Sequence, residues 1–207
     1  MTALAVAAVA YLLGSISFAV LVVRLLQGRD LRAVGSGNAG ATNVLRAAGG
    51  PAAALVLALD LAKGAVPVAV ARALGLGSAA IGGAALAAVL GHVYPIFFGF
   101  RGGKGVATAA GSLVVLLPAA ALAALLVFAL AVAATRVVSI GSIAAALALP
   151  ALAWALGAAG VTAPPPREIW LGSCGIALLV LAKHHGNLRR LLAGTEPRLR
   201  SSRPGKD

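Results

Sequence analysis

Long apolar runs, separated by short polar segments, make up most of the chain. The first run, residues 3–23, has no charged residue over 21 positions, and about 20 apolar residues in a helix suffice to cross the hydrocarbon core of a bilayer. A cleaved signal peptide would carry positive residues before its apolar run, whereas here the cations follow it. The pattern predicts a membrane-spanning helix here, with further apolar runs at residues 52–71, 76–98, 106–134, 137–157 and 169–182.

Composition supports an integral membrane protein and excludes a soluble globular one. The chain is 61% hydrophobic and 11% charged, with a mean hydropathy of +1.01, whereas soluble domains are about 45 to 50% apolar. Its formal charge of +12 indicates anionic partners. The single cysteine, Cys174, allows no internal disulfide, and three histidines offer few metal ligands. We expect neither a metal nor another cofactor.

The positive charges predict the topology. Of the 17 lysines and arginines, 13 lie in three polar stretches, residues 24–50, 99–105 and 183–207. Cytoplasmic loops carry an excess of lysine and arginine, so all three stretches are expected on the cytoplasmic side and the N-terminus outside. An even number of spans must then separate residues 99–105 from the tail.

This parity requires that the run at residues 106–134 be divided. Pro118 lies near its middle, and proline ends or kinks a helix. The prediction is an all-α membrane bundle of seven transmembrane helices with a cytoplasmic C-terminus. It forms one domain over residues 1–207, with motif loops at 24–50 and 99–108 and a basic tail at 183–207. Residues 106–117 would reach only about 18 Å, so a re-entrant segment with five true spans is the alternative.

Two charged residues, Asp60 and Lys63, lie inside the second apolar run. Their i, i+3 spacing places them on one helix face, where pairing would lower the cost of each charge in the membrane. The pair could orient the helix near the interface, or it could take part in substrate binding.

The first polar stretch contains Gly35-Ser36-Gly37-Asn38-Ala39-Gly40, which matches a dinucleotide-binding pattern. That pattern has meaning only after a strand in a βαβ unit, and here a transmembrane helix precedes it. Glycine backbone N–H groups can still face an anion, and the stretch adds side-chain donors and a guanidinium that could clamp a phosphate, namely Ser36, Asn38, Thr42, Asn43 and Arg46. A polar turn that caps the next helix is an equally good interpretation.

The second polar stretch places Gly102-Gly103-Lys104-Gly105 at the start of an apolar helix, with Thr108 one turn on. A helix N-terminus with exposed amides attracts anions, and Lys104 adds a full charge. The spacing does not fit a Walker A loop, so nucleotide hydrolysis is not supported. A basic turn at the membrane interface is the simpler alternative.

The third stretch carries His184 and Asn187 at i, i+3, on one helix face, beside several cations. Neighbouring positive charges disfavour imidazole protonation, which predicts a neutral His184 at pH 7. The alternative is a basic tail that only holds the chain to anionic lipid.

Together the three motifs closely resemble one family, the bacterial acyl-phosphate:glycerol-3-phosphate acyltransferases (PlsY). The resemblance covers nearly the whole chain, and two departures are Ser17, where the family often has proline, and His185, where it often has arginine. It rests on Ser36-Gly37-Asn38-Ala39-Gly40-Ala41-Thr42-Asn43 with Arg46, on Gly91-His92-Val93-Tyr94-Pro95 leading to Gly102-Gly103-Lys104-Gly105-Val106-Ala107-Thr108, and on His184, Asn187 and Arg190-Leu191-Leu192.

The resemblance implies a seven-helix enzyme of the bacterial cytoplasmic membrane, with its active site facing the cytoplasm. It would transfer a fatty acyl group from acyl phosphate to the sn-1 hydroxyl of glycerol 3-phosphate, giving lysophosphatidate and phosphate. It implies no cofactor, no nucleic acid, contact with membrane lipids and a monomer. The catalytic residues would be Ser36, Lys104 and His184, and the substrate-binding residues Arg46, Asn187, Asn38, Thr42, Asn43, Gly37, Gly102, Gly103, Gly105 and Thr108.

Direct attack by the glycerol hydroxyl is the expected mechanism, because acyl phosphate is already activated and Lys104 can stabilise developing charge. The proton would pass to a substrate phosphate or to His184. An acyl-Ser36 intermediate is the rival. A transporter of phosphate esters is disfavoured because no inverted repeat is evident and the motifs gather at one face, and a noncatalytic lipid-binding scaffold would tolerate loss of Lys104.

Overall fold

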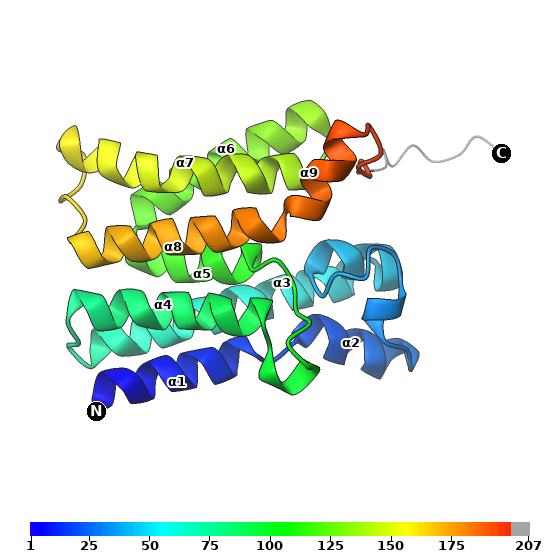
Figure 1. Ribbon diagram of the computed structural model, residues 1–207, viewed down its shortest axis with the longest axis horizontal. Coiled ribbons are helices and arrows are strands. Elements are labelled where there is room, and N and C mark those ends of the chain that lie inside the picture. Colours follow the sequence, from blue (N-terminus) through cyan, green and yellow to red (C-terminus); the bar gives the residue numbers. More distant parts are fainter. Residues whose placement is uncertain (200–207) are drawn as a thin grey trace.

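The computed structural model describes residues 1–199, and that part of the chain folds into α-helices joined by turns (Figure 1). Residues 200–207 of the predicted basic tail lie outside the described residues. Two short 3-10 turns, η1 (Leu31–Ala33) and η2 (Ile96–Phe98), lie in the polar stretches. The α-helices are α1 (Thr2–Gly14), α2 (Phe18–Gln27), α3 (Ala41–Ala73), α4 (Ser78–Val93), α5 (Val106–Leu116), α6 (Pro118–Thr135), α7 (Val138–Ala158), α8 (Arg167–Lys183) and α9 (His185–Leu192).

Length and apolar composition allow five segments of the described chain to cross a membrane: Thr2–Gln27, Ala41–Ala73, Ser78–Phe98, Pro118–Thr135 and Val138–Ala158. Helix α5 has 11 residues and α8 has 17, so both are shorter than these five. Large apolar side chains such as Leu130 and Trp154 are more than half exposed, as expected for surfaces that face lipid rather than water. The all-helical membrane fold is confirmed, whereas the count of seven spans stays a prediction.

The predicted span over residues 3–23 lies within the candidate span Thr2–Gln27, but its helix is interrupted. Helix α1 ends at Gly14 and α2 begins at Phe18, which leaves the carbonyl of Ile16 outside both helices. The Lys63 ammonium donates a hydrogen bond of 2.7 Å to that carbonyl and lies 2.9 Å from the Asp60 carboxylate. The predicted Asp60–Lys63 pair is therefore present, and it stabilises a helix break because Lys63 satisfies a backbone carbonyl that the break leaves without a helical partner.

Pro118 divides the fourth apolar run as predicted. Helix α5 ends at Leu116 and α6 begins at Pro118. Proline cannot continue a helix, but it can begin one, because the N–H that it lacks would have no intrahelical partner at the first helical position.

The two motif loops are shorter than predicted, because both run into helices. Helix α3 already begins at Ala41, and Gly49 interrupts it with φ 83° and ψ −178°. Residues 41–48 thus form a short helical segment before the apolar part of α3, and residues 106–108 are the first turn of α5. Backbone amides at the start of these helices are free of intrahelical partners.

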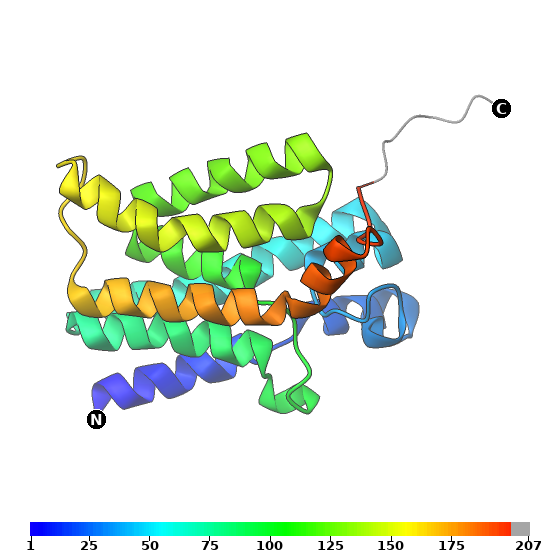
Figure 2. The ribbon, with the colours of Figure 1, turned by 45° about the horizontal axis from the view of Figure 1, so that its top comes forward.

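The three polar stretches lie toward the same end of the bundle, as predicted. In Figures 1 and 2, α2, the segment after it, the loop before α5 and α9 lie toward this end, whereas the N-terminus and the α7–α8 connection lie at the other. Glycines let α3 and α5 pack closely. A Cβ on Gly64 would overlap the Thr108 carbonyl, and one on Gly111 would overlap that of Leu61, which is the small-residue packing typical of membrane helices.

Candidate active site at the polar end

Asn43 holds the first glycine-rich loop in shape. Its amide Nδ2 donates to the carbonyl of Val34 over 2.9 Å, and its Oδ1 accepts a bond of 3.2 Å from the backbone N–H of Ser36. These bonds turn the loop so that Ser36 and Gly37 are exposed while Asn43 is buried. The structure gives Asn43 a positioning role, and its predicted contact with substrate stays a prediction.

The second glycine-rich loop lies directly on a buried histidine. The Gly103 N–H donates to the His92 carbonyl over 3.1 Å, and a Cβ on Gly103 would overlap the His92 ring and lie 2.7 Å from the Ala39 carbonyl. The two glycine-rich loops therefore touch through Gly103 and Ala39. Sequence reasoning treated Gly103 only as an amide donor to an anion and missed this close approach.

His92 connects this loop to the charged pair inside the membrane. Its Nδ1 lies 3.7 Å from Asp60 Oδ1, and both side chains are buried. The pair of Asp60 and Lys63 thus supports the α1–α2 break on one side and the residue beneath Gly103 on the other. This favours a structural role for the pair over direct substrate binding.

Lys104 is the centre of a group of charges contributed by all three motifs. Burial lowers the pKa of Lys104 to about 8, with smaller contributions from the Arg190 and Arg46 guanidiniums, while Glu196 opposes the shift. Charges affect a pKa in this way only when they are near. Arg46, Lys104 and Arg190 therefore lie near enough for their charges to act on one another, as expected for a site that binds a phosphate.

His184 lies beside Lys104 and is neutral at pH 7, as predicted. Burial is the main cause and lowers its pKa to about 4, and the Lys104 charge lowers it further. Its Nδ1 is 2.8 Å from the Val180 carbonyl. A carbonyl can only accept, so Nδ1 carries the proton and Nε2 keeps a lone pair.

Glu196 is a site residue that sequence reasoning missed. Its carboxylate accepts hydrogen bonds from Ser139 (2.6 Å), from Asn187 and from Arg190 (2.7 Å). Burial alone would raise the pKa of Glu196, but these bonds lower it, so the group is an anion. The sequence signal was weak, a carboxylate in a basic tail, and its partners lie on two elements, Ser139 on α7 and both Asn187 and Arg190 on α9.

The remaining predicted residues surround this group. Thr108 is fully buried in the first turn of α5, and its hydroxyl makes no hydrogen bond to a described residue. Gly105 has φ 81°, a conformation that favours glycine, where the loop enters α5. Asn38, Thr42 and Gly102 are half-buried in the two loops. Within residues 1–199, no three His, Cys, Asp or Glu side chains are grouped as metal ligands would be.

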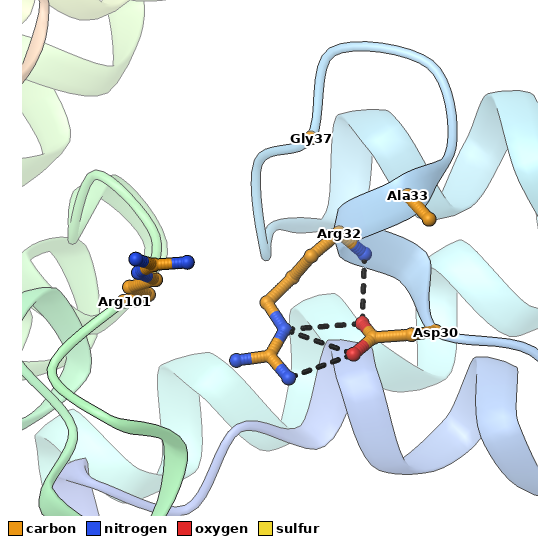
Figure 3. A pocket seen from close by; sticks show the side chains of 6 residues that line it. Asp30, Arg32, Ala33, Gly37 and Arg101 are labelled. Carbon is orange, nitrogen blue, oxygen red and sulfur yellow. Dashed lines mark hydrogen bonds and ion pairs between the residues drawn. The ribbon is translucent and has the colours of Figure 1, made fainter.

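A cavity of about 470 Å³ opens between the two loops, lined by Asp30, Arg32, Ala33, Gly37, Arg101 and Gly102. Figure 3 shows Arg101 on one wall, with Arg32 and Asp30 on the facing segment. Asp30 accepts three hydrogen bonds from the Arg32 guanidinium, of 2.7 to 3.1 Å, and these lower the pKa of that carboxyl. Arg101 forms no ion pair with a described residue.

Apolar helices with cations and glycine-rich loops gathered at one end define a polytopic membrane protein with a positively charged site at its helix ends. Residues 4–194 match the family model described as glycerol-3-phosphate acyltransferase. The chain belongs to this family and is an acyltransferase of the integral membrane kind.

Relatives and solved structures agree with this assignment. The chain is 50% identical over 188 residues to a glycerol-3-phosphate acyltransferase of Pseudomonas syringae pv. tomato, covering 90% of this chain and 93% of that one. A Neisseria meningitidis serogroup B protein with the same name is 46% identical over 200 residues, covering 95% and 96%.

Two crystal structures of PlsY (YgiH), described as an integral membrane glycerol 3-phosphate acyltransferase, share the fold. Its glycerol 3-phosphate form matches with a TM-score of 0.87 and 42% identity, and its lysophosphatidic acid form with 0.84 and 39%. Each alignment covers 97% of this chain and 96% of that one.

Proposed function

We propose that this enzyme transfers a fatty acyl group from acyl phosphate to the sn-1 hydroxyl of glycerol 3-phosphate, releasing lysophosphatidate and inorganic phosphate. The observation that carries the proposal is that the three motifs lie toward one end of the helices, where the charges of Arg46 and Arg190 act on Lys104. Two phosphate-bearing substrates require several cations and backbone donors in one place. The forms in which PlsY was crystallised, with glycerol 3-phosphate and with lysophosphatidic acid, support acceptor and product.

The proposed residue roles follow the resemblance. Ser36, Arg46, Lys104, His184 and Asn187 would hold glycerol 3-phosphate, while backbone amides near Gly37 and Gly102 would hold the phosphate of the donor. Because Asn187 donates to Glu196, the carboxylate also orients that amide. The acyl chain would extend into the lipid beside the apolar helices.

In the proposed reaction, the sn-1 oxygen attacks the acyl carbonyl carbon, and the bond from that carbon to the phosphate oxygen breaks. Lys104 and nearby amides stabilise the negative charge that develops. The hydroxyl proton passes to a substrate phosphate or to Nε2 of His184, whose lone pair is free. Because the pKa of His184 is about 4, it is a weak base, which favours the phosphate.

An acyl-Ser36 intermediate has less support. The Ser36 hydroxyl is exposed and forms no hydrogen bond with a histidine or carboxylate among residues 1–199, so no base is in place to activate it. Incubating the enzyme with labelled acyl phosphate alone tests the point. A label on Ser36 would establish the two-step route.

The donor is tested with purified protein, glycerol 3-phosphate and, in separate reactions, acyl phosphate, acyl-CoA and acyl carrier protein. We expect lysophosphatidate from acyl phosphate alone, and no loss of activity when divalent ions are chelated. Formation of lysophosphatidate only from a thioester would show that acyl phosphate is not the donor. Loss of activity with the chelator would show that a metal takes part.

We also propose seven spans, a cytoplasmic active site in the bacterial cytoplasmic membrane, and a monomer. The distribution of cations supports this orientation, because the end that carries the site holds most of them. The short helices α5 and α8 would add the fourth and the seventh span in chain order to the five longer ones.

The pH dependence of kcat/KM for glycerol 3-phosphate should report Lys104. A lysine is charged below its pKa, and burial lowers that of Lys104 to about 8, so kcat/KM should be sustained below pH 8 and fall above it. Lys104→Arg keeps its charge at high pH and should lack this fall. A fall near pH 8 that persists in Lys104→Arg would contradict the assignment.

A further inference from the structure

The cavity between the two glycine-rich loops has a neighbour that shares lining residues with it. An adjoining cavity of about 580 Å³ shares Asp30, Arg32 and Arg101 with it and adds Arg24, Val20, Phe97, Phe98 and Gly99. Arg24 lies near the end of α2, and Phe97 and Phe98 lie in η2, which ends the candidate span Ser78–Phe98. We call the two cavities together the arginine port.

Charge in the arginine port is strongly positive. Three guanidiniums, those of Arg24, Arg32 and Arg101, line it beside the carboxylate of Asp30. Asp30 is paired with Arg32 over 2.7 Å, and neither Arg24 nor Arg101 forms an ion pair with a described residue. Two guanidiniums therefore remain to bind an anion, and the planar donor fork of arginine suits phosphate oxygens.

Part of the wall of the arginine port is apolar. Val20, Phe97 and Phe98 line it, and Phe97 is 61% exposed. Leu25, on the same helix as Arg24, is 85% exposed. A ligand that fits both features has an anionic head and an apolar chain, whereas glycerol 3-phosphate offers nothing to the apolar wall.

We propose that the arginine port binds the phosphate of a single-chain lipid phosphate as it enters or leaves the active site. The inference rests on the proposed function and deepens it, because acyl phosphate and lysophosphatidate both have this chemistry. Gly102 lines the port and Lys104 follows it by two residues. One short loop therefore joins the port to the group of charges where glycerol 3-phosphate is proposed to bind.

The test compares Arg24→Gln, Arg101→Gln and the double variant with Arg167→Gln, an exposed arginine at the start of α8. Binding of dodecyl phosphate, which cannot donate an acyl group, is measured in uncharged detergent, and KM is measured for each substrate. We expect the double variant to bind dodecyl phosphate about tenfold more weakly, as for loss of charge-assisted hydrogen bonds, with KM for glycerol 3-phosphate unchanged.

The arms of the test separate the two sources of the phosphate. If KM for acyl phosphate rises in the double variant by the factor by which dodecyl phosphate binding weakens, the port binds the donor. Relief of inhibition by lysophosphatidate, with that KM unchanged, assigns it to the product. Unaltered dodecyl phosphate binding in the double variant, or an equal rise in KM for glycerol 3-phosphate, overturns the proposal. A further outcome is that the wild-type protein binds dodecyl phosphate in a way that depends on the two arginines and yet makes no lysophosphatidate. That result would support the port and contradict the proposed function.

Discussion

Replacing Lys104 with glutamine should lower kcat by a factor of about 10² to 10³, the usual cost of removing one group that stabilises charge in a transition state. Lys104 is the residue through which the three motifs meet, since Arg46, Arg190 and Glu196 all influence its pKa. Loss of its charge removes a cation from the place where the leaving phosphate gains negative charge. Steady-state assays with both substrates saturating measure the effect.

Lys183→Gln is the matched control for Lys104→Gln. Lys183 ends α8 near the same polar end, and its ammonium lies 5.0 Å from the centre of the Tyr94 ring. The charges that shift the pKa of Lys104 are instead those of Glu196, Arg190 and Arg46. Its loss should leave kcat within about threefold of the wild type, as for a half-exposed cation without a role in the transition state. Equal losses in both variants would mean that Lys104 acts only through general positive charge.

The sequence alone predicted the features that depend on local chemistry. Apolar length predicts spanning helices because a bilayer admits hardly any other backbone structure, and Pro118 divides α5 from α6 because its ring cannot continue a helix. The gathering of the three polar motifs at one end followed from the distribution of cations. These inferences needed no knowledge of which residues touch.

Features that depend on distant partners could not be predicted in this way. The break between α1 and α2 falls at Ser15 and Ser17 in an otherwise apolar run with no charge, and its stabilising partner, Lys63, lies 47 residues from Ile16. Glu196 enters the site because Ser139, Asn187 and Arg190 surround it in space. Asn43 resembled a substrate ligand, yet its amide is bonded to its own loop. In each case a residue type indicates its chemistry, whereas only the fold shows its partner.

The contact beneath Gly103 leads to the second large effect. Gly103→Ala should lower kcat by about 10²-fold, the scale of a 1 Å misplacement of catalytic groups, because a Cβ there would overlap the His92 ring and press on the Ala39 carbonyl. His92 cannot move freely, since it is buried next to Asp60. The loop that carries Lys104 would have to shift away from the first glycine-rich loop.

Gly83→Ala separates this effect from a general cost of adding a methyl group to a helical membrane protein. No atom lies within 4 Å of a Cβ built on Gly83 in α4, so that variant should keep the kcat and the thermal midpoint of the wild type. If Gly103→Ala keeps its thermal midpoint but loses kcat, the close approach serves the placement of Lys104. Wild-type kcat in Gly103→Ala would instead show that the two loops can separate without affecting the reaction, and the role of position 103 would then lie in its backbone amide alone, which alanine also supplies.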